Sequence, residues 1–359
     1  MEKKTMMVAA VAVIAILVIA AVAVVIGNGG QGGSDADTVT ITQNNGETVE
    51  VAVPVEKICI VNTNAAEFAT ILGVSDRVVG VSDTMIKTPT ESWWANRANI
   101  GTYSEPSAEA ILKTGATIVL GQCTSMPIKN VEALESQGIT VILLDMYGYN
   151  TQVDDLKQFA KLFPDTDASK VATKYGQFFD GVIDKITSKT KDIADADRTS
   201  FISTMGTKAD SKYYTANAEL SKLLTDICGM RNAAAGLTTS SSSSAIIGED
   251  AIVKEFNTNG IDMFILRNTT SYDAAEADIA SFLSTHPIID AEGMFDEMDV
   301  IKTVDSKVLS GPRCFIGMVY FAGVANPGID FGMTLESVIS DYNSQFGTDW
   351  PSEKLFYEA

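Results

Sequence analysis

The sequence is poor in the side chains that bind metal ions and transfer protons. It has one histidine, His286, and its four cysteines are scattered, with no CxxC pair. Zinc, manganese and iron–sulfur sites need several imidazoles or closely spaced thiolates, so the chain lacks their usual ligand sets. We expect no metal site and no cofactor. Whether the cysteines are disulfides or buried thiols is open; they are Cys59, Cys123, Cys228 and Cys314.

Motifs of the common enzyme classes are also missing. There is no GxSxG, no P-loop and no HExxH, and no GxGxxG follows the first predicted buried strand. His286 stands beside Pro287 in a predicted loop, where a catalytic role is not expected. We therefore predict that the protein is not an enzyme. A turnover assay tests this, because a carrier returns its ligand chemically unchanged.

Positive charge is scarce. The chain has 26 Lys and Arg against 46 Asp and Glu, a formal net charge of -20. Such a surface repels a polyanion, so we expect no nucleic-acid partner. The simplest role of the acidity is solubility. With 359 residues, 46% of them hydrophobic, the chain is long enough for two domains with cores of their own.

The N-terminus indicates the compartment. Met6 to Ile26 is apolar without interruption, and about 20 helical residues span a bilayer core. Lys3 and Lys4 precede this run, and the next Lys or Arg is Lys57, so the positive-inside rule places the remainder outside the cell. We predict a transmembrane signal anchor at 1–26 and a flexible linker at 27–37. A cleaved signal peptide is the alternative, although its apolar core is usually shorter. No cysteine follows closely enough for a lipoprotein anchor.

The first folded stretch predicts a hairpin followed by a parallel sheet. Residues 38–53 alternate apolar and polar side chains around an Asn-Gly turn, which is typical of a β-hairpin. Short apolar strands at 57–62, 77–83, 116–122 and 139–145 then alternate with helical segments. This alternation indicates an α/β lobe with a parallel sheet, which we place at 38–163.

A long amphipathic helix follows Pro164. Apolar residues recur in steps of three and four from Val171 to Ile186, predicting a helix within 164–196 of about 28 residues, roughly 40 Å long. That length suits a bridge between two lobes. A second α/β series occupies 197–359 and closes with a predicted terminal helix at 332–347, and the serine run 240–244 reads as a flexible loop.

Several segments resemble the ABC importer substrate-binding proteins of the iron-siderophore and cobalamin type. They are VAVPVEKICIVNTNAAEFATILGVSDRVVGVSD, GTYSEPSAEAILKTGATIVLG, VEALESQGITVILLD, YYTANAELSKLLTDICGMRNAA and MDVIKTVDSKVLSG, in the family's order over about residues 38–350. The resemblance implies two parallel-sheet α/β lobes joined by one rigid helix, with a ligand held between them. It also implies an ABC permease and its ATPase as partners.

The resemblance also suggests how the permease is met. In the family, one glutamate on each lobe docks onto arginines of the permease. The matching positions are Glu109 in SAEAIL and Glu249 in GEDAIV, within two passages that echo each other as a short helix feeding a buried strand. Two exposed carboxylates, one per lobe, would fix the orientation of the carrier. On the residues alone, both glutamates simply favour the positive end of a helix dipole.

Ligands of α/β sheets lie beyond the carboxyl ends of the strands, and this rule selects the candidate ligand residues. In the first lobe they are Asn62, Thr63, Asn64, Ser82, Asp83, Met85, Tyr103, Gln122, Met146 and Tyr147, with Cys123 beside them. In the second lobe they are Met205, Tyr213, Tyr214, Arg267 and Asn268. Trp93 and Trp94 lie in a loop that would border the cleft, although core packing is the alternative for every aromatic residue.

The candidate lining suits a bulky, partly apolar small molecule. Aromatic and methionine side chains recognise such ligands by shape, and Arg267 would pair with an anionic group. A ferric siderophore is the first choice, a corrinoid the second and haem the third. A membrane-anchored sensor or adhesion module on the same fold is the competing function, and it would not need both docking glutamates.

Overall fold

The structure is a computed structural model that describes residues 37–87, 93–124, 126–204, 212–240, 242–267, 271–304 and 306–359. They belong to one compact unit, Ala36–Ala359. The predicted anchor, nearly all of the predicted linker and the candidate residues Met205 and Asn268 lie outside the described residues. No described helix is both long and apolar enough to cross a bilayer.

The predicted hairpin forms from β1 (Thr38–Thr42) and β2 (Thr48–Ala52), which pair antiparallel. Gly46 has φ +85° at the turn, a conformation that glycine adopts at little cost. The backbone N–H of Asn44 donates to the carbonyl of Leu143 at 3.0 Å, which ties the turn to the first sheet.

The first sheet is parallel throughout, as predicted. Its order is β5 (Ala98–Asn99), β4 (Val78–Val81), β3 (Ile58–Ile60), β6 (Ile118–Gly121) and β7 (Thr140–Leu143). Side chains alternate between its faces, so each strand feeds two cores. Ile58 and Ile60 pack in one core with α1 (Thr63–Ile71), whereas Cys59 packs in another with α3 (Ala108–Lys113) and α4 (Val131–Glu135). We call the part built on this sheet the N-half; it also holds α2 (Asp83–Lys87) and α5 (Gln152–Ala160).

The second sheet is parallel except at one edge. Its order is β10 (Arg231–Asn232), β8 (Ser200–Ser203), β12 (Met263–Arg267), β13 (Asp299–Thr303) and β14 (Phe356–Glu358), and β14 runs antiparallel to β13. The predicted closing helix forms as α14 (Leu335–Phe346), but it is not the last element, because the chain returns to the sheet as β14. We call the part built on this sheet the C-half.

Helices and one ribbon complete the C-half. The helices are α7 (Glu219–Asp226), α8 (Ala233–Gly236), α9 (Glu249–Asn259), α10 (Ala275–Thr285), α11 (Pro287–Ala291) and α12 (Met294–Glu297). The ribbon pairs β9 (Tyr213–Thr215) antiparallel with β11 (Ser244–Ile246). The sequence patterns did not predict this ribbon, and Ser244, the last residue of the predicted loop, begins one of its strands.

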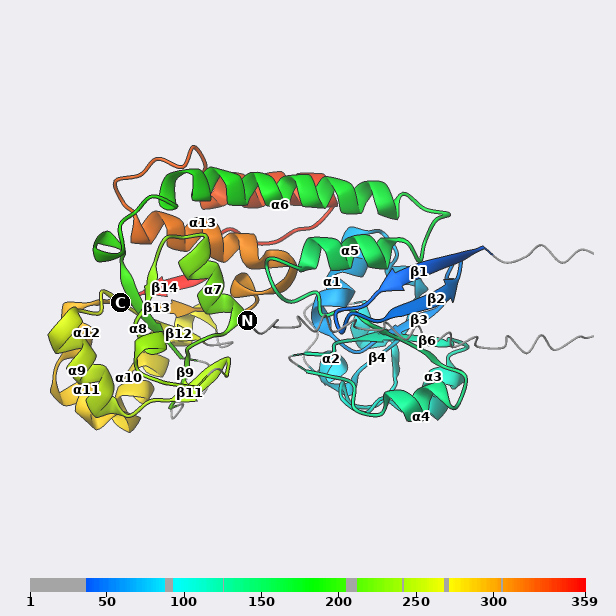
Figure 1. Ribbon diagram of the computed structural model, residues 1–359, viewed down its shortest axis with the longest axis horizontal. Coiled ribbons are helices and arrows are strands. Elements are labelled where there is room, and N and C mark those ends of the chain that lie inside the picture. Colours follow the sequence, from blue (N-terminus) through cyan, green and yellow to red (C-terminus); the bar gives the residue numbers. More distant parts are fainter. Residues whose placement is uncertain are drawn as a thin grey trace, which may run out of the picture. The chain divides into compact units, whose positions relative to one another are not determined.

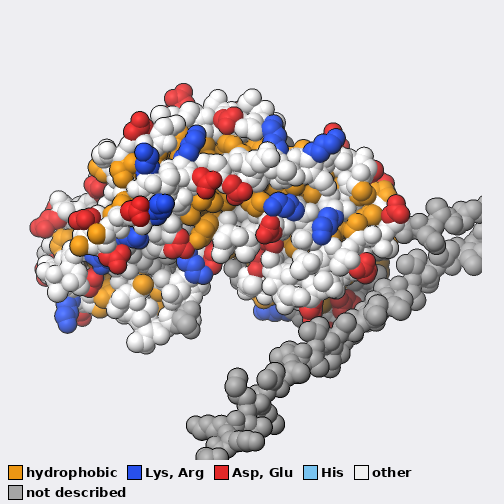
Figure 2. Space-filling model, turned by 45° about the horizontal axis from the view of Figure 1, so that its top comes forward, with side chains coloured by type: hydrophobic (Ala, Val, Ile, Leu, Met, Phe, Trp, Pro, Cys, Tyr) orange, Lys and Arg blue, Asp and Glu red, His pale blue; other side chains and the backbone are white. Residues whose placement is uncertain are grey.

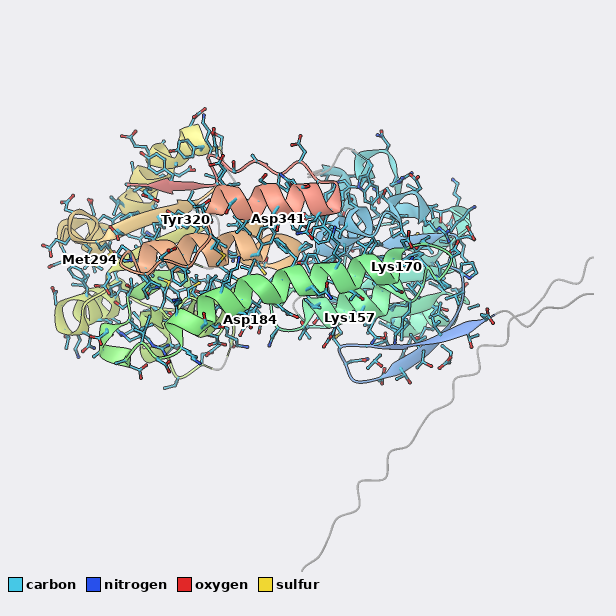
Figure 3. All side chains as sticks on the ribbon, turned by 90° about the horizontal axis from the view of Figure 1, so that it is seen from above. Lys157, Lys170, Asp184, Met294, Tyr320 and Asp341 are labelled. Carbon is cyan, nitrogen blue, oxygen red and sulfur yellow. The ribbon has the colours of Figure 1, made fainter. Side chains whose placement is uncertain are left out.

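The long helix after Pro164 is α6 (Ala168–Thr190), which is 23 residues long, shorter than predicted. It runs from the N-half to the C-half (Figure 1). It does not stand alone: α13 (Cys314–Ala325) packs against both α6 and α14, and Figure 3 shows the three helices side by side. One apolar core extends from Phe68 through Tyr175 and Phe315 to Phe201. The two sheets are therefore joined by a shared helical layer, not by α6 alone.

Candidate ligand-binding cleft

The N-half offers one sheet edge on which the predicted ligand residues gather. Because β3, β4, β6 and β7 are parallel, the residues that follow them lie at one edge of the sheet. Asn62, Ser82, Gln122 and Asp145 stand there. Figure 2 shows the described surface hollowed between the N-half and the C-half. The residues that follow these four strands are therefore the first place to look for ligand contacts in the N-half.

Several of these candidates are held inside the N-half. Asn62 caps α1, its Oδ1 accepting the N–H of Ala65 at 2.7 Å, and Ser82 Oγ donates to the carbonyl of Val61 at 3.0 Å. Asn64, Met85 and Met146 are buried as well. Tyr103 is exposed, whereas Thr63, Asp83 and Tyr147 are half-buried. Of the N-half candidates, the exposed and half-buried side chains are the ones that present surface to solvent.

Two buried polar atoms at this edge lack a partner among the described residues. They are Nδ2 of Asn62 and Oε1 of Gln122, whose own Nε2 donates to the carbonyl of Asp145 at 2.8 Å. Asn62 follows β3 and Gln122 follows the neighbouring β6. An unsatisfied buried donor and acceptor are costly, so each of these two atoms would be stabilised by a hydrogen-bond partner.

The segment after β7 is fixed by two buried carboxylates. Asp145 accepts the N–H groups of Cys123 at 2.8 Å and Thr124 at 3.2 Å, and Asp155 accepts that of Met146 at 2.9 Å. These bonds hold Met146 at φ +50°, a left-handed conformation unusual for a residue with a side chain. Burial raises the pKa of Asp155 to about 6, against hydrogen bonds from Asn44 and Met146 that lower it.

This segment also meets the C-half. The carbonyl of Tyr147 accepts the N–H of Gly311 at 3.0 Å, and Tyr149 Oη donates to Asp226 of α7 at 2.7 Å. Arg267 stands at the end of β12 in the C-half. Burial lowers the pKa of the Arg267 guanidinium, and Tyr147 opposes that shift. The segment after β7 is thus hydrogen-bonded to the C-half at two points.

In the ribbon of β9 and β11, the two predicted tyrosines, Tyr213 and Tyr214, point in opposite directions. Tyr214 is fully buried against Phe264, and its hydroxyl has no partner among the described residues. Tyr213 points the other way and is 51% exposed, directly opposite Ile246, which is 66% exposed. A bridge between Thr204 and Tyr214 attaches the ribbon just beyond β8. It therefore presents an apolar pair beyond the carboxyl edge of the C-half sheet.

Ile246 was not predicted as a site residue. It follows the serine run, and a short SAI segment has no strand pattern of its own, so nothing in the sequence pointed to it. Met126, 46% exposed beyond β6, lies in a segment with no helix or strand and was not predicted either. Large exposed apolar side chains are informative when they cluster, as Tyr213 and Ile246 do.

The two tryptophans pack inward. Trp94 is fully buried, with the Lys307 ammonium 5.4 Å from its ring centroid. Trp93 donates its Nε1–H to Thr70 Oγ1 at 3.0 Å and packs against the ring of Trp94. Their predicted place at the cleft border is corrected: both belong to the packing around α1. The competing prediction of core packing holds for them.

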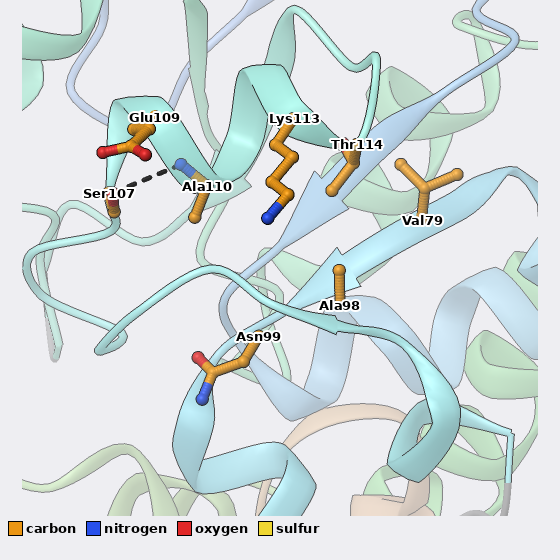
Figure 4. A pocket seen from close by; sticks show the side chains of 8 residues that line it. All are labelled: Val79, Ala98, Asn99, Ser107, Glu109, Ala110, Lys113 and Thr114. Carbon is orange, nitrogen blue, oxygen red and sulfur yellow. Dashed lines mark hydrogen bonds between the residues drawn. The ribbon is translucent and has the colours of Figure 1, made fainter.

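Glu109 stands in the first turn of α3 and is exposed, as expected for a docking residue. It lines a surface pocket of about 640 Å³ between α3 and the edge strand β5 (Figure 4). Lys113, on the same helix, extends toward β5 in that view. Ser107 caps α3 by accepting the N–H of Ala110 at 3.3 Å.

Glu249 is placed differently, although it too lies in the first turn of a helix, α9. It is half-buried, and its Oε2 accepts the N–H of Ile288 at 2.8 Å and of Ile289 at 3.2 Å. The carboxylate therefore satisfies the N-terminal donors of α11. Of the two carboxylates that we expected to be exposed, only that of Glu109 is.

All four cysteines are free thiols, which settles the alternative left open by the sequence. Cys59, Cys228 and Cys314 are buried, and Cys123 is half-buried beside Gln122. Burial raises the pKa of Cys59 and Cys123 to about 11 and that of Cys314 to about 12. At Cys123 the neighbouring Asp145 adds to the effect.

Known structures share this fold. A periplasmic haem-binding protein from Pseudomonas aeruginosa has a TM-score of 0.59 and 17% identity, covering 77% of this chain and 94% of its own. The TroA-like periplasmic binding protein FepB from Veillonella parvula has a TM-score of 0.68 and 12% identity, covering 89% and 99%. CeuE from Helicobacter pylori, with Ni(II) bound, has a TM-score of 0.61 and 20% identity, covering 88% and 98%.

By sequence, the chain matches no family model and no curated protein. The structural likeness spans nearly the whole length of each neighbour. The chain therefore has the fold of the periplasmic binding proteins that serve ABC importers.

Proposed function

We propose that the protein is the extracytoplasmic substrate-binding protein of an ABC importer, capturing a bulky ligand between its N-half and C-half. The observation that carries this proposal is the presence of two separate sheets whose carboxyl edges bear predicted ligand residues, Tyr147 after β7 and Arg267 at the end of β12. Binding sites in α/β folds form at such edges. An enzyme would need reactive groups there, whereas the segment offers a phenol, a guanidinium and buried amides.

Both halves carry side chains that suit a ligand with apolar and anionic parts. Tyr103 and Met126 from the N-half and Tyr213 and Ile246 from the C-half are large and exposed. Arg267 supplies positive charge in a partly buried setting, where a pairing with an anion is stronger than in water. A ferric siderophore has this combination and remains our first choice, with a corrinoid second and haem third.

We further propose that the protein works outside the cytoplasm, held at the membrane by Met6 to Ile26. Its partners would then be an ABC permease and its ATPase. Glu109 is available for docking as it stands. Glu249 would dock through its second carboxylate oxygen while Oε2 keeps its bonds to α11.

The test is a binding measurement with three chemically distinct probes. Fluorescence titration with ferrioxamine B, cyanocobalamin and haemin, together with an absorption spectrum of material that copurifies, identifies the ligand class. We expect Arg267→Ala to weaken binding of the preferred probe by at least tenfold. Arg198→Ala, which removes a C-half arginine paired with Asp195, is the matched control. Unchanged binding in Arg267→Ala, or no binding of any probe, would contradict the proposed site.

A further inference from the structure

The outer edge of the N-half sheet lies beside α3, with a surface hollow of about 640 Å³ between them. One wall is the edge strand β5, and the other is the face of α3 that carries Glu109 and Lys113 (Figure 4). None of its lining residues is a predicted ligand residue. We call this hollow the edge groove and define it by Val79, Ala98, Asn99, Glu109, Ala110 and Lys113.

The edge strand β5 leaves backbone hydrogen-bonding groups unused. The N–H of Ile100, the residue after β5, donates to the carbonyl of Val81 in β4 at 3.1 Å. Backbone groups of successive strand residues point to opposite edges, so the N–H and carbonyl of Asn99 point away from β4. β5 is an outermost strand of its sheet, and Asn99 is exposed. An extended peptide can therefore add to the sheet at this edge.

Across the groove, α3 presents two opposite charges that do not pair with each other. Glu109 and Lys113 are four residues apart, a spacing that usually supports an ion pair on a helix. Within the part of the chain that the structure describes, neither charged group has an ion-pair partner. Both side chains are exposed, and Figure 4 shows them extending in different directions. An anion and a cation are thus both available to a partner.

The spacing of these two charges matches an extended peptide. Four residues of a helix rise about 6 Å. Two residues of a strand span about 6.6 Å, and their side chains lie on the same face. A peptide strand paired with β5 would therefore place a cation beside Glu109 and, two residues away, an anion beside Lys113. The small side chains of Ala98 and Ala110 leave room for the peptide between the strand and the helix.

We propose that the edge groove binds an extracytoplasmic segment of the ABC permease as an added strand on β5, with a permease cation on Glu109 and a permease anion on Lys113. This inference rests on the proposed transport function, which supplies the partner. It goes beyond a single docking carboxylate, because it assigns two opposite charges at alternate positions of one permease segment. A partner with cations alone would be attracted by the net charge of -20 but repelled by Lys113, which gives the contact its specificity.

Fluorescein-labelled heptapeptides test the groove on the purified full-length chain by fluorescence anisotropy. TVRVDVT and TVDVRVT carry the opposite charges in the two strand directions, whereas TVRVRVT carries two cations. We expect one of the first two to bind saturably and at least fivefold more tightly than TVRVRVT. Lys113→Glu should reverse this preference, and Lys129→Glu, which changes an exposed lysine outside the groove, should keep it. Ala98→Phe should weaken binding at least fivefold by filling the groove, while Ala133→Phe, on the exposed side of α4, should not.

A photoreactive benzoylphenylalanine in place of Ala98 identifies the occupant in cells that depend on this chain. We expect it to crosslink a permease segment with alternating opposite charges, and the same group in place of Ala133 to crosslink no permease. The inference is overturned if no peptide binds, if all bind alike, if Lys113→Glu keeps the parent preference, or if the crosslink misses the permease. Such a failure leaves the binding of ferrioxamine B, cyanocobalamin or haemin intact, whereas failure of the transport function removes all three.

Discussion

Arg313 and Glu67 form a buried bidentate ion pair that joins the C-half to the N-half. Arg313 Nη2 lies 3.0 Å from Glu67 Oε1 and its Nε lies 3.1 Å from Oε2, with both side chains at most 3% exposed. Lys307 adds a second cation, 2.6 Å from Oε1. Glu67 belongs to α1, whereas Arg313 precedes α13, so the pair is part of the joint between the two sheets.

Removing Glu67 should destabilise the protein strongly. Glu67→Gln would leave the Arg313 and Lys307 cations without their carboxylate in a buried place, and breaking one side of a buried ion pair costs about 3–5 kcal/mol. Urea denaturation measures the change. Asp167→Asn is the control, since its pair with Lys170 is highly exposed and should contribute little. A loss of stability no larger than that of the control would show that the pair is not a stabilising joint.

The raised pKa of Asp155 should make stability fall as pH rises. Its pKa of about 6 in the folded state exceeds that of an unfolded aspartic acid, so folding favours the protonated form. The stabilising contribution is complete below about pH 4 and is lost as pH rises through 6. The expected difference is on the order of 2–3 kcal/mol, from a shift of about two pKa units.

Asp155→Asn tests this, because the stability difference between parent and variant should change between about pH 4 and 6.5 and then level off. Asp154→Asn alters an exposed neighbour and should show no such change. A pH-independent difference for Asp155→Asn would mean that Asp155 titrates normally.

Glu249 should matter for stability where Glu109 does not. Glu249→Ala removes the acceptor of two N–H groups at the start of α11, and losing a helix cap costs about 1 kcal/mol. Glu109→Ala removes an exposed carboxylate and should leave the unfolding free energy unchanged within error. Equal losses in both variants would contradict the structural role assigned to Glu249.

Charge reversal at Glu109 should separate docking from ligand capture. Glu109→Lys should abolish uptake of a labelled iron chelate by cells that depend on this chain, while the purified variant binds ligand normally. Glu105→Lys, an exposed neighbour outside the helix, is the matched control. If the Glu109 variant supports normal uptake, the docking role is excluded and the sensor function gains support.

Cys123 should be the one thiol that alkylating reagents reach in the folded protein, because Cys59, Cys228 and Cys314 are buried. Its pKa of about 11 is roughly two units above that of a free thiol, so at pH 8 we expect alkylation about a hundredfold slower than for free cysteine. Ligand bound in the cleft should slow it further. Mass spectrometry after iodoacetamide treatment identifies the labelled site, and labelling of Cys59 ahead of Cys123 would contradict the burial described.

The periodic elements were predictable and the side-chain directions were not. Residues 57–145 showed clear strand and helix patterns, and β3, β4, β6 and β7 follow them, whereas the two-residue edge strand β5 was not predicted. By contrast, α13 is apolar on every side and so carries no helical period. β14 and the ribbon are held by pairing with strands distant in the sequence, and the pattern of a short segment does not predict such pairing.

The candidate site shows the same limit. The strand-end rule selected Tyr147 and Arg267 from topology alone, and their role as ligand residues stays a prediction. It could not say that Tyr214 turns into the core while Tyr213 faces outward, because both belong to one short strand of unknown orientation. The contact of Glu249 with α11 spans 39 residues of sequence and was likewise invisible.

The uninterrupted core that links Phe68, Tyr175, Phe315 and Phe201 has a consequence for how the chain denatures. Neither sheet has a hydrophobic core that is complete by itself, because the layer of α6, α13 and α14 contributes to the cores of both. An excised fragment that contains only one sheet would expose a large hydrophobic surface to water and would tend to aggregate. Melting of residues 37–359 should accordingly be a single all-or-none event, with no intermediate in which one sheet survives the other.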